Sequence, residues 1–120
     1  MIPFDENHIY IKSRKEWDRW LNKNHSLSNN VWLIFDKGKT SELSYDDIVE
    51  VALCYGWIDS KAGSVDETRT KLYISKRRSK SNWSNSNMQR VEKLKKLELI
   101  KPAGLKVILD AQKYGNWPIK

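Results

Sequence analysis

Four segments with helical periodicity are interleaved with four short segments rich in β-branched and aromatic residues along this chain of 120 residues. The expected order is β-α-β-α-β-β-α-α. Helices between the early strands, one hairpin and two final helices are typical of an α+β fold. We therefore expect a single small domain over residues 1–120, with a short, mostly antiparallel sheet packed by helices.

Local signals place the elements of the first half. The segment "HIYIK" (8–12) alternates as a short strand does, and Ser13 opens the capping box of a following helix. The segment "VWLIFDKG" (31–38) lacks alternation, so it is expected to be a strand covered on both faces. Ser44 is expected to cap a second helix, which Gly56 ends in the left-handed conformation.

In the second half, residues 57–75 predict a hairpin that turns around Gly63. Ser81 or Ser84 is expected to cap a third helix, and Pro102 to begin a fourth. Tryptophans are numerous. We expect Trp17, Trp20 and Trp32 in the core, because their neighbours are apolar at matching spacing, and Trp57, Trp83 and Trp117 as pocket walls beside turns or basic residues.

Composition excludes several classes of protein. With 39% hydrophobic and 31% charged residues the chain should be globular rather than disordered. It has no apolar run near the ~20 residues of a membrane span, and its N-terminal segment does not resemble a signal peptide. The single Cys54 suits a reducing compartment. A cytoplasmic location without membrane insertion is expected.

The net charge of +7 is concentrated in one segment. Residues 71–96 carry nine basic side chains against one acidic side chain, whereas the rest of the chain carries thirteen basic and fourteen acidic ones. A localised positive field favours an anionic partner.

This basic segment predicts an anion-binding surface around residues 76–87. Hydroxyl groups and unsatisfied backbone N–H groups at a helix N-terminus attract phosphate or carboxylate, and arginines add bidentate contacts. Positive charge would come from Arg77, Arg78 and Lys80, and hydrogen bonds from Ser81, Ser84 and Asn87. The walls would be Trp57 and Trp83, and Asp59 would orient a basic side chain. The alternative interpretation is a solvated helix entry without a ligand.

Two other functions remain open at this stage. A nucleic acid could follow a track of charges beside the rings of Tyr73 and Trp83, although no known DNA or RNA motif is present. The track would comprise Lys76, Arg77, Arg78, Lys80, Arg90 and Lys93, with Lys95 and Lys96 beside it. An enzyme would need Asp59 or Cys54 exposed in a cleft with a perturbed pKa, and we assign no catalytic residue.

The sequence predicts no metal and no cofactor. His8 and His25 lie in different elements without ligands at suitable spacing, and the chain has no HExxH, paired-cysteine or GxGxxG motif. Cys54 near a helix C-terminus lies where the helix dipole disfavours a thiolate, so we expect a small buried residue there.

Three blocks, "ALCYGWIDS" (52–60), "SKSNWSNSN" (79–87) and "KPAGLKVILDAQKYGNW" (101–117), resemble the YdeI/OmpD-associated family of bacteriocin-protection proteins. The resemblance implies a binding or stress-protection module, with no established catalytic residues to transfer. Lys76 stands where that family often has Pro. Its longer members continue into a C-terminal helical segment, and the chain is expected to correspond to the portion before it. The matched positions are Ala52, Leu53, Cys54, Gly56, Trp57, Ile58, Asp59, Arg77, Ser81, Trp83, Ser84, Asn87, Pro102, Ala103 and Gly104.

Overall fold

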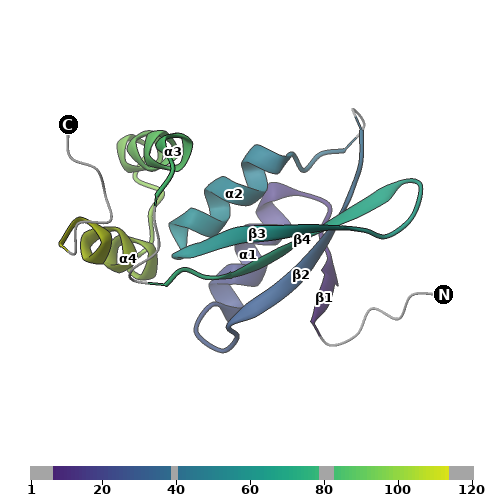
Figure 1. The fold of residues 1–120 in the computed structure, drawn as a ribbon, viewed down its shortest axis with the longest axis horizontal. Helices are drawn as coiled ribbons and strands as arrows, with labels where there is room; N and C mark the ends of the chain where they lie inside the picture. Colours follow the sequence, from purple (N-terminus) through teal and green to yellow (C-terminus); the bar gives the residue numbers. More distant parts are fainter. Residues whose placement is uncertain (1–6, 39–40, 79–82, 114–120) are drawn as a thin grey trace.

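The computed structural model describes residues 7–38, 41–78 and 83–113. The elements follow the expected order and confirm the α+β class (Figure 1). They are β1 (His8–Tyr10), α1 (Arg14–Asn24), β2 (Asn30–Asp36), α2 (Tyr45–Cys54), β3 (Trp57–Ser64), β4 (Arg69–Lys76), α3 (Asn85–Lys96) and α4 (Pro102–Lys113). None of the helices formed by these residues is long and apolar enough to cross a membrane.

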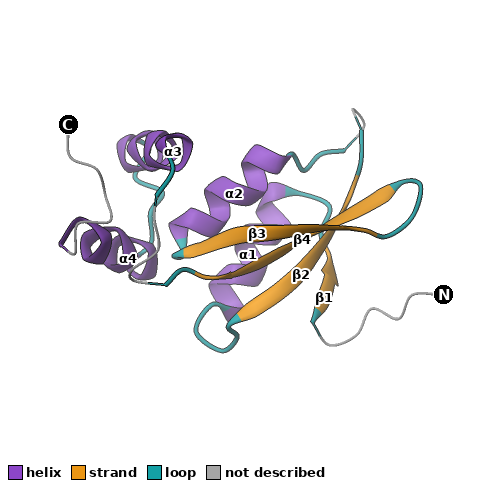
Figure 2. Cartoon of the chain, viewed as in Figure 1, coloured by secondary structure: helices purple, strands orange, loops and turns teal. Residues whose placement is uncertain are grey.

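The strands form one mixed sheet in the order β1-β2-β4-β3. β1 runs parallel to β2, and the other two pairs are antiparallel. Helices α1 and α2 lie on one side of this sheet (Figure 2), and the Trp17 indole nitrogen donates to the Ile48 carbonyl oxygen at 3.1 Å between them. The core joins both helices to one face of β2 and β4 through Trp17, Leu21, Val31, Leu33, Ile48, Leu53, Leu72 and Ile74.

Strand β2 differs from its predicted burial. Val31 and Leu33 face the core, whereas Trp32 is only half-buried and lies outside the core cluster. The prediction that Trp32 is a core residue is therefore wrong, and the prediction that this strand is covered on both faces holds only in part. On the face that carries Trp32, Ile34 is fully buried.

Helix starts follow the predicted capping chemistry. Ser44 and Asp47 form a complete capping box, with the Asp47 carboxylate accepting from the Ser44 N–H at 3.1 Å. Ser13 accepts from the Glu16 N–H, but the Glu16 carboxylate accepts from the Lys12 N–H instead of completing the box. The outcome is the same, because each side chain satisfies backbone donors at the entry to a helix.

Helices α3 and α4 lie beyond the C-terminal end of α2 (Figure 1). Two glycines allow α4 to approach closely. A Cβ at Gly104 would lie 2.3 Å from the Cys54 carbonyl oxygen, and a Cβ at Gly56, whose φ is +79°, would lie 2.8 Å from Val107 Cγ2. The Lys101 N–H donates to the Cys54 carbonyl oxygen at 2.9 Å. The start of α4 is thereby fixed against the turn between α2 and β3.

Candidate functional site

The structure brings Arg77 and Trp83 of the predicted ligand-binding set together. The guanidinium carbon lies 3.7 Å from the centre of the Trp83 ring, and both residues are buried. Burial lowers the pKa of Arg77 to about 10, while the Asp59 carboxylate acts in the opposite direction. Arg77 therefore keeps its charge at neutral pH and is held in one position against the indole ring.

Ser84 and Asn87 are engaged in the start of α3. Ser84 is its N-cap, and its hydroxyl oxygen accepts from the Asn87 N–H at 3.1 Å. The Asn87 side-chain oxygen accepts from Arg90 at 3.1 Å. These side chains give the helix its entry, and their predicted role toward a ligand remains a prediction.

Trp57 and Asp59 lie on β3 at different depths. Trp57 is almost fully buried and packs edge-to-face with Trp20. Asp59 is half-buried and accepts from the Tyr45 hydroxyl at 2.8 Å. Arg78 is exposed, and the predictions for Lys80, Ser81 and Trp117 lie outside the described residues.

Acidic side chains of α2 neutralise part of the basic segment 71–96. Arg90 pairs with Asp46 at 2.6 Å and Lys93 pairs with Glu50 at 2.8 Å. Glu50 is buried and also pairs with Arg14 at 2.9 Å. The run of charge seen in the sequence is thus partly balanced by residues distant in the chain.

A cavity of about 340 Å³ lies beside Arg77, between the C-terminal end of α1, the start of β3, the end of β4 and the start of α4. We call it the His25 pocket. His25 is fixed by its Nδ1–H, which donates to the Leu21 carbonyl oxygen at 2.8 Å. None of the described residues that line the pocket is acidic. They are His25, Ser26, Tyr55, Gly56, Trp57, Lys76, Arg77, Ala103 and Val107.

Sequence reasoning assigned no ligand-binding role to His25, Ser26 or Tyr55, or to the first turn of α4. The His25 and Tyr55 rings contact each other directly, with their centres 5.0 Å apart, and the first turn of α4 reaches them because Gly56 and Gly104 allow α4 to pack against the end of α2. The block that contains "CYGWID" was a usable signal, since a glycine with positive φ between a helix and a strand marks a close approach of backbones.

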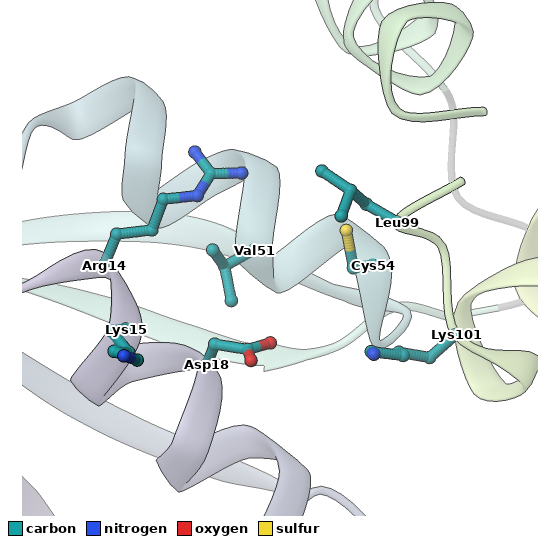
Figure 3. A pocket seen from close by; sticks show the side chains of 7 residues that line it. All are labelled: Arg14, Lys15, Asp18, Val51, Cys54, Leu99 and Lys101. Atoms are coloured by element: carbon teal, nitrogen blue, oxygen red, sulfur yellow. The ribbon is translucent and has the colours of Figure 1, made fainter. Parts of the chain in front are cut away.

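A second cavity of about 360 Å³ lies between α1, the C-terminal half of α2 and the segment before α4 (Figure 3). Its lining mixes charges of both signs, and Asp18 also accepts from the Tyr55 hydroxyl at 3.0 Å. Cys54 is buried, as expected, and burial raises the pKa of its thiol to about 11. The lining residues are Arg14, Lys15, Asp18, Val51, Cys54, Leu99 and Lys101.

The residues that line these two cavities favour ligand binding over nucleophilic catalysis or metal binding. The Cys54 thiol stays protonated at neutral pH, so it is a poor nucleophile. Among the described residues, no group of three or more His, Cys, Asp or Glu side chains is placed to hold a metal ion. The His25 pocket offers positive charge, hydroxyl groups and an aromatic wall, which are the components of a binding site.

The fold and this pocket define a small α+β domain with a basic cavity where its second helix, its hairpin and its last helix meet. The chain belongs to the family described as a domain of unknown function, DUF8412, whose sequence model matches residues 9–107. No curated protein and no solved structure matches the chain significantly. The resemblance to YdeI/OmpD-associated proteins stays a prediction.

Proposed function

We propose that this domain is a binding module for a small ligand carrying a phosphate or a carboxylate, held in the His25 pocket. The observation that carries the proposal is the lining of that pocket: Lys76, Arg77 and His25 converge there, and none of its described lining residues is acidic. The proposal keeps Arg77 and Trp57 from the predicted surface and moves its centre toward α1 and α4. The stress-protection role implied by the family resemblance is part of the same proposal.

Arg77 is suited to be the main anchor. Its guanidinium group is restrained by the Trp83 ring, so a ligand would not have to immobilise a flexible side chain. It is also largely removed from water, and charge-assisted hydrogen bonds are stronger where solvent is excluded. The exposed Lys76 would add attraction with less geometric specificity.

The first turn of α4 provides a second source of positive potential. Ala103 lines the pocket and lies directly after Pro102, the first residue of a helix of 12 residues. Backbone N–H groups in this turn have no partner within the helix, and the helix dipole places partial positive charge there. The pocket volume of about 340 Å³ is at the small end of ligand sites and favours a ligand of metabolite size.

The two alternatives predicted from the sequence receive less support. For nucleic-acid binding along residues 71–96, Arg90 and Lys93 already pair with acidic residues of α2. For catalysis, the raised pKa of Cys54 disfavours a thiolate, and Asp59 already accepts a hydrogen bond from Tyr45.

The proposal is tested by thermal unfolding with inorganic phosphate, pyrophosphate, nucleoside monophosphates and small dicarboxylates at two salt concentrations. A ligand present at 100 times its Kd stabilises the folded state by about 2.7 kcal/mol. This should raise the Tm by several degrees for a domain of this size. The high-salt series separates a specific site from general charge screening.

Arg77→Met is the informative variant because it retains most of the volume packed on Trp83 while removing the charge. It should fold and lose the ligand-induced shift in Tm. Lys106→Met, on an exposed lysine of α4, is the matched control and should keep the shift. The proposal fails if no anion stabilises the wild-type domain, or if Arg77→Met retains the full shift.

A further inference from the structure

The face of the sheet that is turned away from α1 and α2 carries a cluster of aromatic rings. The strand register pairs His8 of β1 with Trp32 of β2, and Trp32 with Tyr73 of β4. His8 and Trp32 are stacked with 9° between their planes, and the centres of the Trp32 and Tyr73 rings are 5.1 Å apart. We call His8, Tyr10, Trp32 and Tyr73 the aromatic face.

These rings are not part of the hydrophobic core. All four are half-buried, and the core cluster contains their neighbours Leu33, Leu72 and Ile74, which point to the opposite face. Trp32 also extends across the sheet. A Cβ at Gly63 on β3 would lie 3.5 Å from Trp32 Cζ3, so the indole of a β2 residue reaches over β4.

Basic side chains surround the same rings. The ammonium nitrogens of Lys71 and Lys61 lie 4.5 Å from the centre of the Trp32 ring and 5.3 Å from that of Tyr73, respectively. Lys71 also donates to His8 Nε2 at 3.0 Å, because an ammonium group can only donate. The centre of the face therefore combines exposed ring surface with positive charge.

The acidic groups of this face lie toward its loop end. Asp36 accepts from the Tyr10 hydroxyl, and Asp66 pairs with Arg69 at 2.6 Å. These carboxylates are thus held by groups at the β3–β4 loop and at β1, away from Lys61 and the Tyr73 ring. The strand register places Asp36 opposite Arg69 and Trp32 opposite Tyr73, so negative charge lies at the Tyr10 end of the face, four residues along β2 from Trp32.

We propose that the aromatic face binds single-stranded nucleic acid. Bases stack on aromatic side chains without requiring a particular sequence, and adjacent lysines neutralise phosphates. Protein–protein interfaces are depleted in lysine, whereas this face places lysine ammonium groups over the Trp32, Tyr73 and Tyr10 rings. The site is separate from the His25 pocket, and it does not depend on the basic segment of α3.

The test is fluorescence anisotropy of labelled ten-nucleotide oligo(U) and oligo(dT) in 50 mM and 200 mM salt. Loss of one stacking ring should weaken binding about 5- to 150-fold, the equivalent of roughly 1–3 kcal/mol per base. Trp32→Leu and Tyr73→Leu are therefore the main variants. Tyr45→Leu, which removes an exposed tyrosine of α2, is the matched control and should leave binding unchanged.

Lys61→Gln provides a variant that is safe for folding, because Lys61 is exposed on β3. It should weaken binding and make the slope of log K against log salt shallower by about 0.7, as expected for one phosphate contact to a single strand. Lys106→Gln on α4 should change neither quantity. Circular dichroism and thermal unfolding establish that each variant is folded.

Two results would overturn the proposal. One is the absence of binding to both oligonucleotides at 50 mM salt. The other is binding that survives Trp32→Leu and Tyr73→Leu but is lost when Lys95 and Lys96 of α3 are replaced by Gln, which would place the nucleic acid on the helix. Arg77→Met distinguishes this proposal from the anion site, since it should abolish a phosphate-induced Tm shift without changing oligonucleotide affinity.

Discussion

Trp83 and Trp32 carry the same interaction in opposite surroundings. Each has a basic side chain over its ring, with Arg77 3.7 Å from the ring centre of Trp83 and Lys71 4.5 Å from that of Trp32. Trp83 is buried where α3 begins, whereas Trp32 is half-buried on the open face of the sheet. The cation–ring pair at Trp83 is part of the packed interior, whereas the pair at Trp32 is part of an accessible surface.

The difference comes from the secondary structure around each ring. At the helical end, α2, α3 and α4 converge, and α2 supplies Asp46 and Glu50 as partners for the cations of α3. On the sheet, α1 and α2 occupy one face only (Figure 2), so residues of the other face contact each other and solvent. Stability should therefore depend mainly on the first region, and binding of large ligands on the second.

Replacing each tryptophan with alanine gives the strongest test of this division. Trp83→Ala should lower the free energy of unfolding by about 3–5 kcal/mol, as for a large aromatic residue removed from a core. Trp32→Ala should cost about 1–2 kcal/mol, because much of its area is already in contact with water. Urea unfolding at pH 7 measures both values. Equal losses would show that Trp32 is as much a core residue as Trp83.

Substitutions at Gly104 and Gly63 test the same comparison between the helical end and the open face of the sheet. A Cβ at Gly104 would lie 2.3 Å from a backbone oxygen, whereas a Cβ at Gly63 would meet the Cε atom of the flexible Lys71 side chain at 2.9 Å. Gly104→Ala should therefore displace α4 and cost about 2–3 kcal/mol. Gly63→Ala should change stability by less than about 1 kcal/mol, because Lys71 can move aside.

Thermal unfolding of the two alanine variants provides the measurement. Since the start of α4 borders the His25 pocket, Gly104→Ala should also reduce any stabilisation by anions. Gly63→Ala should leave it intact. A Gly104→Ala domain with wild-type Tm would mean that α4 does not pack closely on the end of α2.

The order of elements could be predicted from the sequence because its determinants are local. Ser44 with Asp47, and Gly56 with its positive φ, act over a few residues. The environment of the tryptophans could not be predicted in the same way. Trp32 lies in an apolar segment and Trp83 lies among polar residues. Nevertheless, Trp32 is only half-buried beside its β4 partner Tyr73, whereas Arg77 covers the ring of Trp83.

The candidate site was only partly predictable for the same reason. Charge counting along residues 71–96 could not reveal Asp46 and Glu50 as partners, since they lie on α2. Nor could it reveal that Arg77, from the end of β4, shares a pocket with His25 and Ala103. These contacts depend on how α4 is placed against α2; Gly56 signals a close approach of backbones, but no local pattern indicates which element approaches.

The smallest expected effect concerns charge at the helical end. Burial disfavours the Glu50 carboxylate, but hydrogen bonds from Lys93 and Arg14 outweigh this and lower its pKa below the ordinary 4.5. A carboxyl group whose pKa is lower in the folded state than in the unfolded state stabilises the protein at pH values above its unfolded-state pKa. This contribution is lost as the pH falls through the folded-state pKa. Glu50 should therefore stabilise the domain at pH 7 and lose this contribution progressively as the pH falls below 4.5.

Glu50→Gln should cost about 1–2 kcal/mol at pH 7, because its two basic partners are partly exposed and screened by solvent. At pH 3 the variant and the wild type should differ by less, since the wild-type carboxyl group is then increasingly protonated. Glu92→Gln, an exposed residue of α3, is the control and should follow the wild type at both pH values. Urea unfolding at the two pH values decides the matter: a Glu50→Gln loss that stays constant with pH would assign the role of Glu50 to side-chain packing, and the charge pairing between α2 and α3 would not stabilise this end of the molecule.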